Sequence, residues 1–311
     1  MKKVKNCLLL IGIVLVAYPA NVLHWAQQAG GPDWKPVEQA LGKAGSMQPG
    51  DVYKVSFPRG DLKVTAAGVE LNPALALGTW VAFKRMGDMT LVMGDLVLTE
   101  NEVTPVLDTL QKGGVETTAL HNHVLNESPR VMYMHIHAVG DAVKIAKTIH
   151  DALTLTKTSF AAPAAGSQSA DIGIDTKQID QIMGQSGKVN GGVYQYGIAR
   201  ADEITDTGMM QDSHKTVIPP AMGLAQVINF QPTGGGKAAI TGDFVLLASE
   251  VNPVIKALRD NGIEITALHS HMLTENPRLF FMHFWANDDA LKLARGLRSA
   301  LDKVNVLKGA N

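Results

Sequence analysis

The chain has 311 residues, of which 46% are hydrophobic and 18% are charged, a composition that excludes a disordered protein and a coiled coil. Its 28 basic and 29 acidic residues leave a formal net charge of −1, so the charge balance favours neither nucleic acid nor anionic lipid as a partner. The single cysteine, Cys7, excludes a disulfide framework and a zinc ribbon.

The N-terminus has the pattern of a secretion signal. Lysines within the first five residues precede an apolar run from Cys7 to Ala20, in which Pro19 breaks a helix. The run is short for a membrane span, which needs about 20 residues. We therefore predict a signal peptide over residues 1–20, with an alternative end at residue 29, and a periplasmic or secreted protein. The alternative is an uncleaved N-terminal segment, which is the only contact with a membrane that we expect.

The sequence contains an internal repeat. Residues 115–141 and 263–289 are identical at 14 of 27 positions, at a constant offset of 148 residues. The similarity extends upstream of both segments, and a tract without periodicity separates the two copies. We therefore predict two homologous domains, repeat 1 over residues 32–155 and repeat 2 over residues 171–306, joined by a linker over residues 156–170.

Each copy is expected to begin with a short helix and several strands. The helices are predicted over about residues 34–44 and 175–186, and the strands that follow are rich in Val, Tyr, Phe and Thr. An Arg-x-Asp pattern occurs once in each copy, beginning at Arg59 and at Arg200. Because it falls at the end of a predicted strand, we expect a surface ion pair there rather than a ligand contact.

A strand, a helix, two strands and a second helix are expected to complete each copy. In repeat 1 the helix begins near Thr99, where Thr99 and Glu102 fit a capping box. The last helix is predicted over about residues 141–155 in repeat 1 and 288–303 in repeat 2. The order predicts an α+β fold of two homologous repeats, each with a ferredoxin-like strand–helix–strand–strand–helix core and extra N-terminal strands.

Seven of the ten histidines fall in the strands that precede the last helix of each copy. Side chains along a strand alternate between two faces, and all seven histidines have odd numbers, so we expect them on one face. Their even-numbered neighbours are apolar and should pack against the helices. If the hairpin turns near Ser128, His121 lies opposite His135 on the neighbouring strand. The seven residues are His121, His123, His135, His137, His269, His271 and His283.

Histidines in this arrangement predict a metal site. Three imidazoles on adjacent strands, with a carboxylate in the turn between the strands, suit Zn, Cu, Ni or Fe. The candidate carboxylates are Glu127 in repeat 1 and Glu275 in repeat 2. We therefore expect one site of three histidines in each copy, and packing histidines that only hydrogen-bond are the alternative.

The two copies differ on this face. Tyr133 and His137 of repeat 1 are replaced by Phe281 and Trp285 in repeat 2. Repeat 1 therefore keeps two more polar groups, and we expect it to be the better metal site.

Three functions fit these features. The leading hypothesis is an exported protein that binds a transition metal, or a metal-dependent small ligand, through His121, His123 and His135 and through His269, His271 and His283, with His137 as a further candidate ligand. The second is a metal-dependent hydrolase or lyase, in which Glu127 or Glu275 is the general base toward a metal-bound water. The third is a non-catalytic envelope protein that binds a polypeptide or a lipid and whose histidines are structural. In none of the three do we expect a nucleic-acid partner.

Three segments of repeat 1 carry a distinctive pattern, which begins at Pro73 (PALALGTWVAF), at Val92 (VMGDLVLTENEVTPVLDTLQKGG) and at Glu116 (ETTALHNHVLNESPRVMYMHIH). With their counterparts in repeat 2, these segments resemble a bacterial family of exported proteins named after the mycobacterial lipoproteins LppY and LpqO. The resemblance covers nearly the whole chain after the predicted signal, and it implies export without implying an activity. The chain lacks the lipobox cysteine of the lipoprotein members, so the resemblance does not extend to a lipid anchor.

Overall fold

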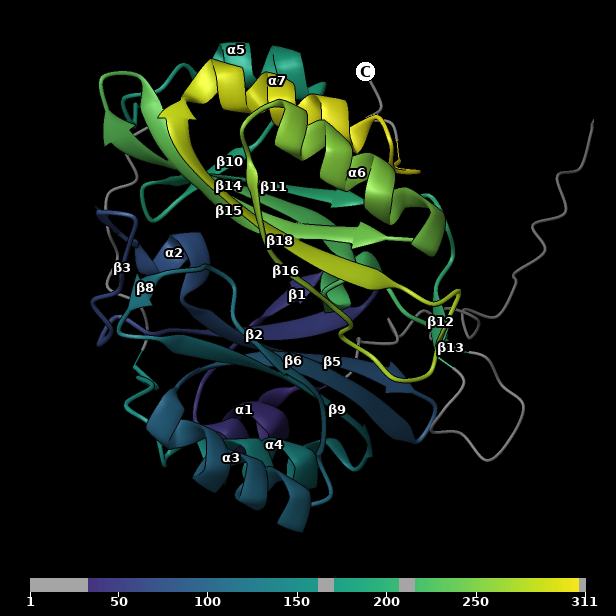
Figure 1. Cartoon of the computed structure of the whole chain (residues 1–311). Helices are drawn as coiled ribbons and strands as arrows, with labels where there is room; N and C mark the ends of the chain where they lie inside the picture. The colour runs from purple at the N-terminus through teal and green to yellow at the C-terminus, as the bar shows by residue number, and fades with distance from the viewer. Residues whose placement is uncertain (1–32, 162–170, 207–215, 308–311) are drawn as a thin grey trace, which may run out of the picture. The chain divides into compact units, whose positions relative to one another are not determined.

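The computed structural model describes residues 33–161, 171–206 and 216–307 (Figure 1). The predicted signal peptide and residues 162–170 of the predicted linker lie outside the described residues. From Trp34 onward the chain belongs to one packing unit. No helix in the described ranges is long and apolar enough to cross a membrane.

Repeat 1 forms a six-stranded antiparallel sheet with the strand order β1-β2-β5-β6-β9-β7. Helices lie along one face of this sheet (Figure 1). The strands are β1 (Ser46–Gln48), β2 (Val52–Pro58), β5 (Gly78–Met86), β6 (Met89–Thr99), β7 (Glu116–His121) and β9 (Val131–Gly140). The helices are α1 (Lys35–Leu41), α3 (Glu100–Lys112) and α4 (Ala142–Leu153).

Repeat 2 has the same arrangement, with the strand order β10-β11-β14-β15-β18-β16. Its strands are β10 (Lys188–Asn190), β11 (Val193–Ala199), β14 (Ala225–Gly234), β15 (Lys237–Leu246), β16 (Glu264–His269) and β18 (Phe280–Asp289). Its helices are α5 (Thr176–Met183), α6 (Ala248–Asp260) and α7 (Ala290–Leu301). The predicted mixed α+β fold with two similar domains is therefore confirmed.

Each repeat also has a small three-stranded sheet. Its strand order is β4-β3-β8 in repeat 1 and β13-β12-β17 in repeat 2. Its strands are β3 (Thr65–Ala66), β4 (Val69–Glu70) and β8 (Glu127–Ser128) in repeat 1, and β12 (Thr205–Asp206), β13 (Thr216–Val217) and β17 (Glu275–Asn276) in repeat 2. The helix α2 (Pro73–Ala76) and the 3₁₀ turn η1 (Pro220–Met222) complete the described elements.

The helix after β6 begins where its capping residues predict. The backbone N–H of Thr99 donates to the carboxylate of Glu102 at 2.8 Å, which satisfies a donor that the first helical turn leaves unpaired. The same bond recurs in repeat 2, where the N–H of Leu247 donates to Glu250 at 2.7 Å. Both helices therefore start immediately after a strand of the sheet.

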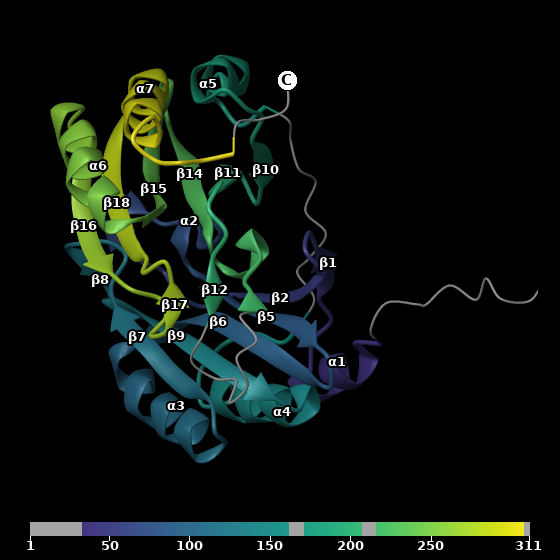
Figure 2. The same cartoon turned by 90° about the vertical axis from the view of Figure 1, so that its right-hand side faces the viewer.

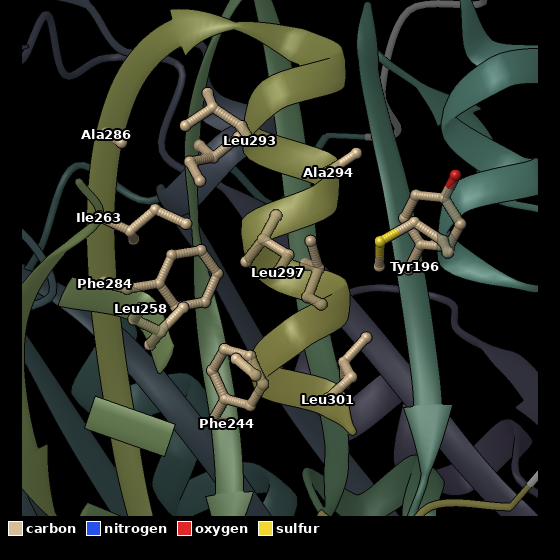
Figure 3. Close-up of a cluster of buried hydrophobic side chains, with 14 of the residues drawn as sticks. Tyr196, Phe244, Leu258, Ile263, Phe284, Ala286, Leu293, Ala294, Leu297 and Leu301 are labelled. Atoms are coloured by element: carbon tan, nitrogen blue, oxygen red, sulfur yellow. The ribbon is translucent and has the colours of Figure 1, made fainter. Parts of the chain in front are cut away.

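On β6, β9, β15 and β18 the helices cover the even-numbered face, as the alternation of side chains predicts for the histidine strands. On β2 and β5 they cover odd-numbered residues instead, such as Val55 and Phe83. Met134 and Ile136 of β9 belong to one buried cluster with Leu110 of α3 and Ile149 of α4. Figure 3 shows the equivalent core of repeat 2, in which side chains of α7 pack on Phe284 of β18. Each repeat therefore has a hydrophobic core of its own between the sheet and the helices.

The faces of the two sheets that the helices leave open pack against each other (Figure 2), and they carry the odd-numbered residues of β6, β9, β15 and β18. One buried cluster joins Met93 of repeat 1 to Val245 and Phe281 of repeat 2. A second cluster joins Tyr133 of repeat 1 to Trp285 of repeat 2. Because the predicted histidine face lies on this side of each sheet, the packing of the repeats encloses it.

The repeated Arg-x-Asp pattern forms ion pairs, but they are buried, so the expectation of a surface pair was wrong. Arg59 is fully buried, and its guanidinium donates to Asp61 at 2.8 Å, to Glu102 at 2.9 Å and to the carbonyl of Val97 at 2.7 Å. Arg200 makes the equivalent contacts in repeat 2. A planar guanidinium has several N–H donors, so Arg59 at the end of β2 can bind β6 and the first turn of α3 at the same time.

Candidate metal centre

Six histidines meet between the two sheets. The Nε2 atoms of His121 and His135 are 2.9 Å apart, so these two side chains share a face, as predicted. The ring of His121 also stacks on that of His269 from the other repeat, with centroids 3.6 Å apart. The six residues are His121, His123, His135, His269, His271 and His283.

The strand register differs by two residues from the prediction. His121 pairs with Tyr133, and Ala119 pairs with His135, with an irregularity between Thr117 and Ala119. A shift of two residues leaves every side chain on its predicted face, whereas a shift of one would have reversed them all. The histidines therefore still converge, through diagonal rather than direct neighbours.

The ring contacts between the repeats are reciprocal. The centroid of the His123 ring lies 3.8 Å from that of His283. The centroid of the His271 ring lies 3.7 Å from that of His135. The offset of 148 residues converts the first pair into the second, so each His-x-His segment lies against the last histidine strand of the other repeat.

Hydrogen bonds repeat this reciprocity. The hydroxyl of Thr118 donates to the carbonyl of His271 at 2.6 Å, and the hydroxyl of Thr266 donates to the carbonyl of His123 at 2.6 Å. The same offset exchanges these two bonds. The repeats are therefore related by twofold pseudosymmetry at the centre, in the manner of an isologous interface.

Three sets of ligand atoms lie close enough together to hold a metal ion. Two of the sets draw on both repeats, the third lies within repeat 2, and each set shares a histidine with each of the others. Within each set the atoms are within 4.8 Å of one another. The sets are His121, His135, His269 and His271; His121, His123 and His283; and Asp243, His271 and His283. Instead of the expected separate site in each copy, the structure has one centre shared by the two copies.

Two aspartates at the centre were not predicted as ligands. The Nε2 of His271 lies 3.2 Å from a carboxylate oxygen of Asp243, and the Nε2 of His123 lies 3.8 Å from one of Asp95. Asp95 lies on β6 and Asp243 on β15, the strands next to the histidine strands. The signal for them was present, because Gly-Asp recurs at the same offset and both aspartates have odd numbers.

Backbone carbonyls fix the orientation of two imidazoles. The Nδ1 of His283 donates to the carbonyl of Gly242 at 2.7 Å, and the Nδ1 of His121 donates to the carbonyl of Asn122 at 3.1 Å. In both rings the lone pair is then on Nε2, the arrangement that a carbonyl imposes on metal-binding histidines. Gly242 is required there, because a Cβ atom would lie 1.9 Å from the carbonyl oxygen of Val227.

Many polar atoms of the centre are buried and unsatisfied. An unpaired buried polar group costs about 1–3 kcal/mol, so native proteins contain few of them. Among the described residues, the following atoms of the centre have no hydrogen-bond partner: Nε2 of His123, His271 and His283, both ring nitrogens of His269, and one oxygen each of Asp95 and Asp243.

Burial favours the uncharged forms of the side chains of the centre. It lowers the pKa of His121 to about 3 and that of His283 to about 4, with a further contribution from neighbouring histidines. Burial raises the pKa of Asp95 to about 8, helped by the nearby Asp243, whose own pKa is raised to about 6 by burial. Neutral imidazole is the form that binds metals, so the histidines are ready to ligate at neutral pH.

His137 lies apart from the ligand sets formed by the described residues. Its Nε2 is 2.8 Å from a carboxylate oxygen of Asp206, whose other oxygen accepts from the hydroxyl of Thr274 at 2.7 Å. The equivalent positions across the pseudosymmetry hold Trp285 and Ala66, which are buried in one apolar cluster. Of the seven predicted histidines, His137 is thus the one whose ring contacts a carboxylate outside the centre.

The two predicted glutamates also lie outside the ligand sets. One carboxylate oxygen of Glu127 accepts from the N–H of Val131 at 3.0 Å, and the other is buried without a hydrogen-bond partner among the described residues. Burial raises the pKa of Glu127 to about 7. Glu275 accepts the equivalent bond from Leu279 and lies 3.4 Å from Arg278.

An aromatic ring backs one histidine in each repeat. Tyr133 stacks on His123 with centroids 3.3 Å apart, and Phe281 stacks on His271 at 3.5 Å. The hydroxyl of Tyr133 is buried and has no hydrogen-bond partner in the described part of the chain. The difference between the copies that the sequence shows is therefore located directly beside the centre.

The matches to known proteins assign no function. No curated protein matches the chain. The chain is similar to the crystal structure of PduB, a trimeric bacterial microcompartment shell protein, with 11% identity over 86% of this chain and 96% of that chain, at a TM-score of 0.20. It is similar to EtuB from Clostridium kluyveri with 8% identity over 83% of this chain and 88% of that chain, at a TM-score of 0.19. TM-scores this low carry no argument.

The two repeats match the same family. Residues 35–155 and residues 177–303 each match the family described as Domain of Unknown Function (DUF1259). Together these segments cover most of the sequence. The chain therefore belongs to the DUF1259 family.

Proposed function

We propose that this protein binds a transition metal through the histidine centre. The observation that carries the proposal is the convergence of unpartnered ring nitrogens from both repeats on one buried volume. Imidazole and carboxylate ligands together suit Zn, Cu, Ni or Fe. The partner is then a metal ion or a small ligand held by one, and not a nucleic acid.

Metal binding accounts for the centre better than packing does. A packing histidine needs both ring nitrogens satisfied, and His269 has neither satisfied among the described residues. A divalent cation would take up the free lone pairs and offset the charge of Asp95 and Asp243 when they ionise. Structural histidines in a non-catalytic envelope protein are therefore the weaker candidate.

A metal-dependent hydrolase or lyase is the second candidate function. It is favoured by Glu127, whose free carboxylate oxygen and pKa near 7 suit a general base at neutral pH. Glu275 is less suited, because it has Arg278 as a partner. In this reading Glu127 would receive a proton from a water that the metal binds.

We also propose a ferredoxin-like core for each repeat and export of the protein. The neighbouring order β6-β9-β7, with α3 and α4 on one face, supports such a core in repeat 1. The lysine-rich, apolar N-terminus and the resemblance to the LppY and LpqO proteins support a periplasmic or secreted location.

The test of metal binding is the metal content of the chain purified without a histidine tag. We expect the protein to retain Zn, Cu, Ni or Fe through gel filtration, measured by mass spectrometry of the metals. The double variant His135→Ala/His283→Ala should lose it. The control variant His150→Ala should keep its metal, because His150 hydrogen-bonds to the carbonyl of Leu41 and is not part of the centre. Equal metal content in wild type and double variant would contradict the proposal.

A further inference from the structure

The pseudosymmetry axis passes between His121 and His269. The offset of 148 residues exchanges these two histidines, and their rings stack with centroids 3.6 Å apart. The same offset exchanges the other ring contacts and hydrogen bonds between the repeats. In a twofold arrangement a residue that contacts its own counterpart lies next to the axis.

A metal ion has no place between the two stacked rings. An imidazole binds a metal through a nitrogen lone pair in the plane of its ring, at about 2.0–2.1 Å. The space between His121 and His269 presents ring faces, and rings 3.6 Å apart leave no room for an ion. An ion bound by either ring must therefore lie beside a ring edge, and the pseudosymmetry gives every such position off the axis an equivalent position on the other side.

We infer that the centre holds two metal ions, one on each side of the His121–His269 stack. Each ion takes the His-x-His pair of one repeat and a third histidine from the facing strand of the other repeat. Site A consists of His121, His123 and His283, and site B consists of His269, His271 and His135. The inference rests on the proposed metal binding and adds to it the number of ions and the crossed origin of the ligands.

The ligand distances carry both sites. The ligand atoms of site A lie within 4.8 Å of one another, and those of site B lie within the same distance of one another and of His121. The offset of 148 residues turns every member of site A into a member of site B. The Nδ1 of His283 is held by the carbonyl of Gly242, which leaves its Nε2 free for site A.

The charges near the histidines also come in a symmetric pair. Asp95 lies beside His123 of site A, and Asp243 lies beside His271 of site B. Each aspartate has one buried oxygen without a hydrogen-bond partner among the described residues. Two carboxylates offset part of the charge of two divalent ions, which a buried site requires.

The first test counts the ions. The untagged full chain is equilibrated with Co²⁺ and passed through a desalting column, after which cobalt and protein are measured. We expect two Co²⁺ per chain. One Co²⁺ per chain overturns this inference and leaves the proposed function standing, whereas no bound Co²⁺ overturns both.

The second test asks which histidines share an ion. His123→Ala removes a ligand of site A and should leave one Co²⁺ per chain. Adding His283→Ala affects the same site and should still leave one, whereas adding His135→Ala affects site B and should leave none. If each site took its ligands from a single repeat, the two double variants would exchange their results. Circular dichroism checks that each variant is folded.

A measurement on the wild-type chain replaces the variants if these do not fold. Two Cu²⁺ ions on either side of one pair of stacked rings are near enough for their electron spins to couple. The electron paramagnetic resonance spectrum of the fully Cu²⁺-loaded protein should therefore show a half-field transition. A spectrum of isolated Cu²⁺ ions at full loading overturns the inference.

Discussion

Glu127 and Glu275 occupy equivalent positions in the two repeats, yet their surroundings differ. Each accepts a backbone N–H four residues further along the chain, from Val131 and from Leu279. Arg278 lies 3.4 Å from Glu275, whereas one oxygen of Glu127 is buried without a hydrogen-bond partner in the described part of the chain. Burial dominates at Glu127 and raises its pKa to about 7.

Glu127→Gln should therefore stabilise the metal-free protein at high pH. A carboxyl whose pKa is raised on folding favours its protonated form, so the wild type loses stability as the pH rises from about 4.5 to about 7. We expect the variant to gain roughly 1–2 kcal/mol in free energy of unfolding at pH 8 and almost nothing at pH 4.5, less than the full shift because Glu127 is partly exposed. Urea unfolding at both pH values measures the difference.

Glu100→Gln is the control for this prediction, because Glu100 is exposed and lies 4.0 Å from Arg130. Its effect should be small and equal at both pH values. A gain for Glu127→Gln that does not depend on pH would show that the buried charge is not its cause.

Part of the centre can be predicted at the level of single residues. The odd numbers of the histidines give their common face directly, because a strand has a period of two. Asp95 and Asp243 were missed, although Gly-Asp recurs at the offset of 148 residues and both aspartates share the odd numbers of the histidines. His137 was included on parity alone, and only the structure shows Asp206 beside it. Parity gives the face of a side chain but not its partner.

At the level of the elements, Gly242 joins sheet geometry to the centre. It lies on β15, its carbonyl holds His283, and the carbonyl oxygen of Val227 on β14 occupies the place of a Cβ atom. The close approach of β14 and β15 at this point therefore depends on the missing side chain.

Gly242→Ala should separate the two strands locally. A Cβ atom 1.9 Å from a backbone oxygen forces the backbone to move, and we expect a loss of about 2–3 kcal/mol in free energy of unfolding, measured with denaturant. The control is Gly197→Ala on β11, where a Cβ atom meets nothing within 4 Å. Similar stability of the two variants would show that the close approach of β14 and β15 does not depend on the missing side chain of Gly242.

Arg59 ties a strand end to the start of α3, and its removal should be costly. Arg59→Met leaves Asp61 and Glu102 without their buried cation. We therefore expect the free energy of unfolding to fall by about 3–5 kcal/mol. Arg130→Met is the matched control, because Arg130 and Glu100 form an exposed pair and the effect should stay below about 0.5 kcal/mol. Both are measured by denaturant unfolding, and equal losses would contradict the prediction.

The order of the elements could be predicted because caps, turns and strand periodicity are local signals. The capping box at Thr99 and Glu102 gave the start of α3 to the residue. The packing of one sheet on the other is not a local signal. An apolar residue such as Met93 or Val245 has the same pattern whether a helix or a second sheet covers it, so the sharing of one centre by two repeats appears only in the fold.

At the level of the whole molecule, the repeats depend on each other for burial. Each sheet has a core under its own helices, but its other face is buried in clusters to which residues of both repeats contribute. Opening the contact between the sheets would expose Tyr133, Phe281 and the apolar side chains around them, together with the histidines. A state with one repeat folded and the other unfolded therefore loses all of the burial between the two sheets.

The described body of the chain should accordingly unfold as one cooperative unit. Val254 is fully buried in the core of repeat 2, and Val245 is fully buried in a cluster shared by both repeats. Val254→Ala and Val245→Ala should each lower the free energy of unfolding by about 2 kcal/mol. If unfolding is cooperative, both variants lower the protection of the slowest-exchanging amides by roughly 30-fold in both repeats, including β6, whose side chains belong to the core of repeat 1. Native-state hydrogen exchange of the metal-free protein measures this change in protection.

Loss of protection confined to repeat 2 in Val254→Ala would contradict the prediction. It would mean that the repeats unfold separately, because a destabilised core in one repeat would then leave the strands of the other repeat unaffected.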